Sequence, residues 1–416
     1  MKIKYNSIAF FPVFLLLLFP EYSIQTSLHL EKKSCHTIYL CKTYLGLGVS
    51  DWIIVLMGLI LIFCILHKGY ISIDKSSTFY KVVQISIIYL IIGAIYNLTV
   101  VFNLISYLYD FKLFLYFIVI YFWLKQFGRV ELEEKHIIYF FIIGAIGSLW
   151  DYYYVSNFGV IQRPNLLPFI PVIMPLIEPN YLILLMICFK QHRWWLSFLF
   201  IFEILSLFNQ ATLGGLYGLG MAIVFILIYQ KKFTEKLIFI ILFFSFIFLL
   251  AVLPLILYEV LPMISDIKSD GLDIRKMKTL SVLDNYFMNI PIIIGKGLGS
   301  TYFETFTSDY TNVFSTGVHF TEGNVKFVMH TPLALFYKFG LVGTFAMMYI
   351  LIKTSVKLFK LSQFKNDNMA KFLSISYPLI IMGSLITPGI IKNALMVGIF
   401  IFISDQKLQK IKNKFF

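Results

Sequence analysis

Long apolar runs separated by short polar breaks are the feature that most constrains how this chain can fold. Hydrophobic residues make up 59% of its 416 residues and charged residues only 14%, whereas a soluble domain carries about 25% charged residues. A membrane-spanning helix needs about 20 mostly apolar residues, so the apolar content suffices for about a dozen spans. The sequence therefore predicts an all-α polytopic membrane protein and excludes a cytosolic enzyme or a disordered chain.

We expect twelve transmembrane helices, one for each apolar run. The runs cover approximately residues 8–19, 52–66, 82–104, 111–124, 137–150, 166–189, 195–208, 213–229, 237–258, 332–352, 372–386 and 391–403. The first run resembles a signal peptide but lacks a small-residue cleavage site, so we interpret it as an uncleaved helix. The expected organisation is helices one to nine in residues 1–258, one large outer loop in 259–330, and helices ten to twelve with a cytoplasmic tail in 331–416.

Lysines and arginines are distributed unevenly between the two sides that twelve spans would create. With the N-terminus in the cytoplasm, the short cytoplasmic segments contain 22 of them, and the short outer segments contain only Lys32, Lys33, Lys42, Lys112, Arg163 and Lys392. Cytoplasmic loops of membrane proteins carry such an excess. The distribution predicts that both termini are cytoplasmic, and it explains the net charge of +13 without nucleic-acid binding.

Cysteine usage and short motifs indicate little further chemistry. Cys64 and Cys188 lie in apolar runs, whereas Cys35 and Cys41 share one polar loop and either pair there or stay reduced, depending on the compartment. The sequence contains no CxxC, HExxH or nucleotide P-loop pattern. We therefore expect no metal and no cofactor.

The 72-residue loop from Glu259 to His330 concentrates the polar residues that the rest of the chain avoids. Long loops in compact proteins are usually functional. In this loop, apolar residues spaced by three and four positions from Met277 to Ile290, including Leu280 and Leu283, predict an amphipathic helix. Its basic end, formed by Arg275, Lys276 and Lys278, suits either an anionic head group or a solvated helix face.

Further along the loop, Gly295, Gly297 and Gly299 alternate with Lys296 and Leu298. Glycines permit positive φ angles and allow backbone N–H groups to approach an anion closely. The stretch therefore predicts either a phosphate-binding turn or a tight structural turn.

Three further residues attract attention by their positions. His330 ends the loop, where an imidazole can accept a proton at neutral pH or act as an interface anchor. Arg163 is the only basic residue of its outer loop, so it needs a phosphate or a carboxylate partner. Lys338 lies within an apolar run, where a charge usually faces the bundle interior and pairs there.

In their order along the chain, these motifs resemble those of the O-antigen polymerase and ligase superfamily, whose polymerases are the Wzy type. The resemblance rests on Arg275, Pro291, the glycine stretch, His330 and the GLVG stretch of residues 340–343, together with the QRPN stretch that contains Arg163. It spans about half of the chain. It departs from the family pattern at Thr331, where Asn or Ser is commoner.

The resemblance implies a GT-C-like fold in a bacterial inner membrane and metal-independent transfer of glycans between lipid-linked sugars. Arg163 and Arg275 would bind the pyrophosphate of an undecaprenyl-pyrophosphate donor, and His330 would deprotonate the acceptor hydroxyl. Lys276, Lys278, Lys296 and the three glycines would assist in binding the substrate. A chain-length regulator and a flippase would be its protein partners.

Two other functions fit parts of the same pattern. An O-antigen ligase would share every motif and differ only in its acceptor, the lipid A–core. A lipid-linked oligosaccharide flippase would also have twelve helices, but it would need no 72-residue outer loop. We therefore expect a polymerase of O-antigen or capsular repeat units.

Overall fold

The computed structural model describes part of the chain. The described residues are 11–13, 15–16, 49–68, 73–101, 104–127, 220–221, 223–229, 233–247, 280–284, 293–303, 324–325, 333–386 and 394–415. Structural statements below concern these residues. They are almost entirely helical, as the sequence predicts.

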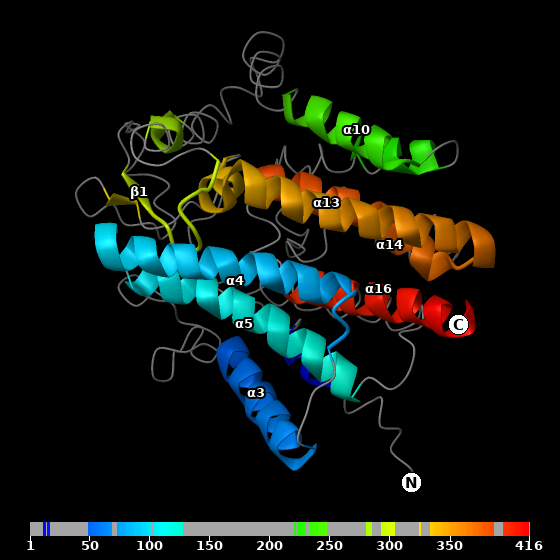
Figure 1. The fold of residues 1–416 in the computed structure, drawn as a ribbon, viewed down its shortest axis with the longest axis horizontal. Helices are drawn as coiled ribbons and strands as arrows, with labels where there is room; N and C mark the ends of the chain where they lie inside the picture. The colour runs from blue at the N-terminus through cyan, green and yellow to red at the C-terminus, as the bar shows by residue number, and fades with distance from the viewer. Residues whose placement is uncertain are drawn as a thin grey trace, which may run out of the picture.

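The elements whose bounds the structure gives are mostly α-helices, with one short π-helix (Figure 1). They are α3 (Val49–Lys68), α4 (Thr78–Tyr96), the π-helix η1 (Asn97–Val101), α5 (Leu104–Phe127), α10 (Glu235–Ile247), α13 (Ala334–Lys365), α14 (Asn368–Ile386) and α16 (Ala394–Phe415). The strands β1 (Tyr302–Phe303) and β2 (Asn324–Val325) form one antiparallel pair, in which Tyr302 lies opposite Val325.

The helices lie on the predicted apolar runs and extend beyond them into polar sequence. α13 continues to Lys365, well past the predicted end at residue 352, and α5 includes Lys112, which the charge count had placed in an outer loop. α4 begins four residues early because Ser77 caps it, accepting a hydrogen bond from the Tyr80 N–H at 3.1 Å. Apolar runs therefore locate these helices, and capping or polar turns decide their ends.

Two of the described helical segments are long and apolar enough to cross a membrane by length and composition. They are Thr78–Thr99 and Leu335–Lys365, and Asp51–His67 is a shorter apolar helix. This supports a membrane protein in coarse terms. The twelve-span topology, the inner-membrane location and the orientation of the termini stay predictions.

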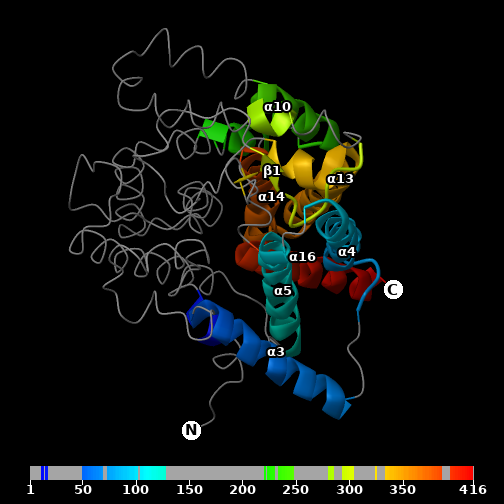
Figure 2. The same cartoon turned by 90° about the vertical axis from the view of Figure 1, so that its left-hand side faces the viewer.

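The core forms among α4, α5, α13, α14 and α16 (Figures 1 and 2). α13 packs along α14 and contacts α4, while α16 packs against α5. Large side chains such as Tyr337, Phe372, Tyr377 and Phe400 are fully buried between these helices. By contrast, α3 leaves Phe63 71% exposed, and such an apolar outer surface suits contact with lipid chains.

Candidate functional site

The predicted site residues divide into two groups in the structure. Arg163, Arg275, His330, Lys276 and Lys278 lie outside the described residues. The glycine stretch with Lys296 is described, and so is one turn of the predicted amphipathic helix, residues 280–284.

That helical turn confirms the predicted helix at residues 280–284, and its side chains differ in exposure. Ser281 and Val282 are buried, whereas Leu280 is 36% exposed and Leu283 is half-buried. Leu280 and Leu283, two residues of the predicted apolar face, are thus more exposed than Ser281 and Val282.

The glycine stretch adopts a backbone that ordinary residues rarely adopt. Gly295, Gly297 and Gly299 have φ angles of 77°, 83° and 79°, in the left-handed region. Consecutive N–H groups point in different directions and each finds an acceptor. Lys296 N–H donates to the Tyr337 carbonyl and Gly297 N–H to the Lys338 carbonyl, both at 2.9 Å.

The next two N–H groups bind the neighbouring helices. Leu298 N–H donates to the Tyr89 carbonyl of α4 at 2.9 Å, and Gly299 N–H donates to Oδ2 of Asp110 on α5 at 2.5 Å. Four successive N–H groups thus have acceptors within the protein. This arrangement fits the interpretation of the stretch as a structural turn, and substrate binding by its glycines stays a prediction.

The glycines also allow the loop to lie in direct backbone contact with three helices. A Cβ atom on Gly297 would overlap the backbone of Gly93 in α4, and one on Gly299 would overlap Tyr107 in α5. A Cβ on Gly295 would overlap Gly340 in α13. The loop is therefore wedged into the end of the bundle, and no larger residue fits at these positions without moving a helix.

The contact with α13 depends on a break in that helix. Gly340 has φ of 61° and ψ of −175°, which interrupts the regular helical geometry inside α13. Near this break, the carbonyls of Tyr337 and Lys338 accept the loop N–H groups, and Val342 N–H donates to the Ile293 carbonyl at 3.2 Å. The GLVG stretch of residues 340–343 and the glycine stretch of residues 295–299 thus lie in direct contact.

Lys296 projects from this loop into an aromatic enclosure. Its side chain is buried, with Nζ 2.8 Å from the Tyr337 hydroxyl and 5.4 Å from the centre of the Tyr96 ring. The Tyr337 hydroxyl donates in turn to the Thr301 carbonyl at 2.8 Å. Burial lowers the pKa of Lys296 to about 8, because removing the ammonium group from water disfavours its charged form.

Beside the loop, Lys338 of α13 forms a buried ion pair with Asp110 of α5. Both residues are at most 3% exposed, and Asp110 also accepts the Gly299 N–H. The expectation that Lys338 pairs inside the bundle is confirmed. The pair joins α5, α13 and the glycine loop at a single point.

Sequence reasoning missed Asp110, Gly93 and Tyr337. Asp110 had a recognisable signal, since it is a lone carboxylate beside an apolar run and Lys338 needs an opposite charge. Gly93 and Tyr337 had none, because a glycine or a tyrosine in an apolar helix is ordinary. Within the described ranges, no group of three or more His, Cys, Asp or Glu residues is placed to hold a metal ion.

Comparison with known proteins leaves the family open. No model of a protein family, no characterised protein sequence and no solved structure matches the chain.

Proposed function

We propose that this chain is a membrane glycosyltransferase that polymerises undecaprenyl-pyrophosphate-linked O-antigen or capsular repeat units. The observation that carries the proposal is the direct contact between the glycine stretch and the GLVG stretch. Both belong to the pattern by which the chain resembles the polymerase and ligase superfamily, and they are about 40 residues apart in sequence. Their contact gives the large loop a rigid base at one end of the bundle.

The position of His330 in the sequence places it only a few residues from this contact between the two glycine-containing stretches. His330 precedes Leu333 by three residues, and three extended residues span at most about 11 Å. The Leu333 carbonyl accepts a hydrogen bond from Tyr337 N–H at 2.8 Å, in the turn that also meets Lys296. So short a connection suits a general base that acts beside the glycine loop.

The proposed reaction is a direct displacement at the anomeric carbon of the donor sugar. His330 takes the proton of the acceptor hydroxyl, and the hydroxyl oxygen forms a bond to the anomeric carbon. The bond from that carbon to the pyrophosphate oxygen breaks, and its electron pair leaves with the pyrophosphate. The configuration inverts, and the arginines Arg163 and Arg275 stabilise the negative charge that develops on the leaving group.

In this scheme the described residues position the reacting groups. The glycine loop has its N–H groups from Lys296 to Gly299 engaged within the protein, so it holds the flanking segments in place beside the proposed substrate. The ammonium group of Lys296 adds positive charge beside the glycine loop, whereas that of Lys338 is paired with Asp110. The chain would lie in the bacterial inner membrane with twelve spans and cytoplasmic termini, and it would work with a flippase and a chain-length regulator.

The test of the transferase is the variant His330→Ala, with His67→Ala on the exposed end of α3 as the matched control. Purified protein is given lipid-linked repeat units, and the products are separated by length. We expect His330→Ala to lose about 10²–10⁴-fold in rate, because general-base assistance is lost. His67→Ala should match the wild type, and equal activity of both variants would refute the proposal.

A strain that lacks the chain separates the polymerase from its alternatives on a gel of surface polysaccharide. A polymerase deletion should leave one repeat unit on the lipid A–core, whereas a ligase deletion should leave none. For a flippase, restoring the His330→Ala variant to this strain would restore the normal ladder. The single-unit pattern is the result we expect.

A further inference from the structure

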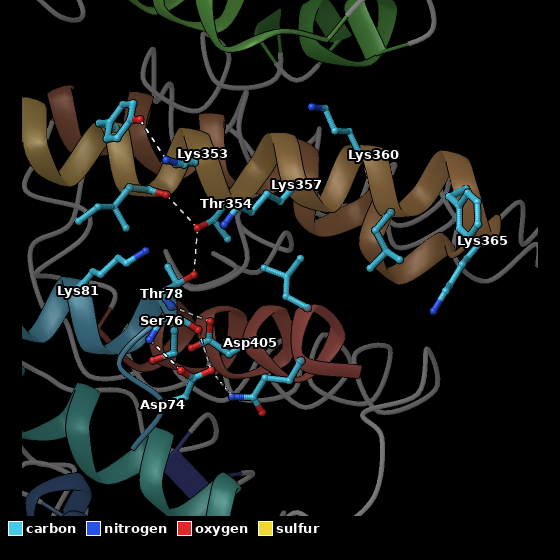
Figure 3. A pocket seen from close by; sticks show the side chains of 17 residues that line it. Asp74, Ser76, Thr78, Lys81, Lys353, Thr354, Lys357, Lys360, Lys365 and Asp405 are labelled. Carbon is cyan, nitrogen blue, oxygen red and sulfur yellow. Dashed lines mark hydrogen bonds between the residues drawn. The ribbon is translucent and has the colours of Figure 1, made fainter. Parts of the chain in front are cut away.

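A cavity lies at the opposite end of the bundle from the glycine loop. It has a volume of about 710 Å³ and is bordered by the start of α4, the second half of α13 and the end of α16 (Figure 3). Five lysines line it, namely Lys81, Lys353, Lys357, Lys360 and Lys365. This is the end that the charge distribution predicts to be cytoplasmic.

The two carboxylates of the cavity accept hydrogen bonds at the start of α4 and in the turn before it. Asp405 of α16 is 4% exposed and accepts the Thr78 N–H at 2.8 Å and the Phe79 N–H at 3.1 Å. Asp74 accepts the N–H and the hydroxyl of Ser76 at 2.8 and 2.9 Å. The N-terminus of α4 is thus already satisfied by Asp405, and the cavity lining contains five lysines against two carboxylates.

The lysines come from two helices that face each other across the cavity. Lys81 extends from α4 and Lys357 from α13 toward the space between them, whereas Lys360 is turned away from α4 (Figure 3). Lys353 donates from Nζ to the Tyr349 hydroxyl at 3.3 Å. Between these side chains, Thr78 and Thr354 contact each other through their hydroxyls at 3.0 Å, which joins the two helices across the cavity.

Part of the remaining lining is apolar, and the cavity is partly open to the outside. Tyr349 is 46% exposed and Phe364 is 75% exposed, and Ile350, Leu361 and Leu408 also line the cavity. A soluble phosphate compound needs no such apolar border. A phospholipid does, because its phosphate and its acyl chains leave the same glycerol unit.

We propose that this lysine-lined cavity binds the phosphate headgroup of an anionic membrane lipid. Basic pockets between transmembrane helices on the cytoplasmic side are suited to such headgroups. The ammonium groups neutralise the phosphodiester, and Tyr349 and Phe364 contact the upper part of the acyl chains. This site is separate from the proposed glycosyl transfer, and its ligand is not a substrate.

The test compares two variants that remove the same charge. Lys81→Gln/Lys357→Gln removes two lysines of the cavity, and Lys75→Gln/Lys236→Gln removes two exposed lysines that do not line it. Binding of phosphatidylglycerol to the detergent-purified full chain is measured by native mass spectrometry, with phosphatidylcholine as the neutral lipid. We expect the cavity variant to bind phosphatidylglycerol roughly 25-fold more weakly, at about fivefold per lysine.

The control variant should bind phosphatidylglycerol like the wild type, and phosphatidylcholine should bind equally to all three proteins. Equal loss in both variants would overturn the proposal, because the effect would then be general surface charge. A second arm adds inorganic phosphate and glycerol phosphate and follows the thermal unfolding of lipid-free protein. Stabilisation of the wild type but not of the cavity variant by these compounds would assign the cavity to a soluble phosphate and overturn the lipid assignment.

Folding of the variants is checked by gel filtration. If the double variant fails to give a monodisperse protein, Lys353→Gln and Lys357→Gln are measured singly, since both side chains are exposed. Each should weaken phosphatidylglycerol binding about fivefold. Wild-type affinity in both single variants would refute the proposal.

Discussion

The buried pair of Asp110 and Lys338 offers the sharpest test of how the end of the bundle is held together. We consider Asp110→Asn, which removes the negative charge but keeps an oxygen that can accept the Gly299 N–H. Lys338 then loses its carboxylate partner, and its ammonium group stays buried because the residue is only 3% exposed. Breaking a buried pair in this way costs about 3–5 kcal/mol of unfolding free energy.

The double variant Asp110→Asn/Lys338→Met completes the cycle. It removes both charges and keeps the acceptor for Gly299, so it should unfold within about 1–2 kcal/mol of the wild type, since a neutral replacement of a buried pair is often tolerated. The loss of unfolding free energy in the double variant should therefore be smaller than the sum of the losses in Asp110→Asn and Lys338→Met. Unfolding free energies are measured for all four proteins by denaturant titration in one detergent.

A matched control comes from the pair of Lys407 and Asp367, whose side chains are each 20% exposed and 2.7 Å apart. Lys407→Met should cost only about 0–1 kcal/mol, because solvent screens this pair. If Asp110→Asn costs no more than Lys407→Met, the pair is not buried as described. Equality between the double variant and the sum of the singles would refute the coupling of α5 to α13 through these two residues.

Three further predictions concern the glycine loop and the proposed reaction. Gly297→Ala should reduce the melting temperature and the yield of folded protein, because its Cβ would overlap the Gly93 backbone. Gly220→Ala, whose Cβ meets no atom within 4 Å, should leave both quantities unchanged. Equal melting temperatures and yields for the two variants would contradict the close packing at Gly297. Burial lowers the pKa of Lys296 from 10.5 to about 8, so between these values the unfolded chain binds the proton more tightly than the folded protein. The melting temperature of the wild type relative to Lys296→Met should therefore rise between pH 8 and pH 10. A difference in melting temperature that does not change with pH would contradict the lowered pKa. Purified protein should keep its polymerase activity in EDTA, and strict metal dependence would overturn the proposed mechanism.

The amino-acid sequence by itself determined the helical character of this chain and the places where helices form. Apolar runs of this length favour the helix in a membrane, because a helix satisfies every backbone N–H and C=O group within the segment itself. The sequence also indicated that Lys338 needs a buried partner and that the alternating glycines make a special turn. These are local properties, so no knowledge of neighbouring segments was required.

The tertiary structure alone decided which groups meet. Asp110 pairs with Lys338 across 228 positions of sequence, and the Thr78 N–H meets Asp405 across 327. The amides of residues 296–299 find their acceptors on α4, α5 and α13, and which helices supply them could not be seen in the sequence. Cavities and buried pairs arise from the packing of distant helices, and periodicity along one chain carries no information on which faces will meet.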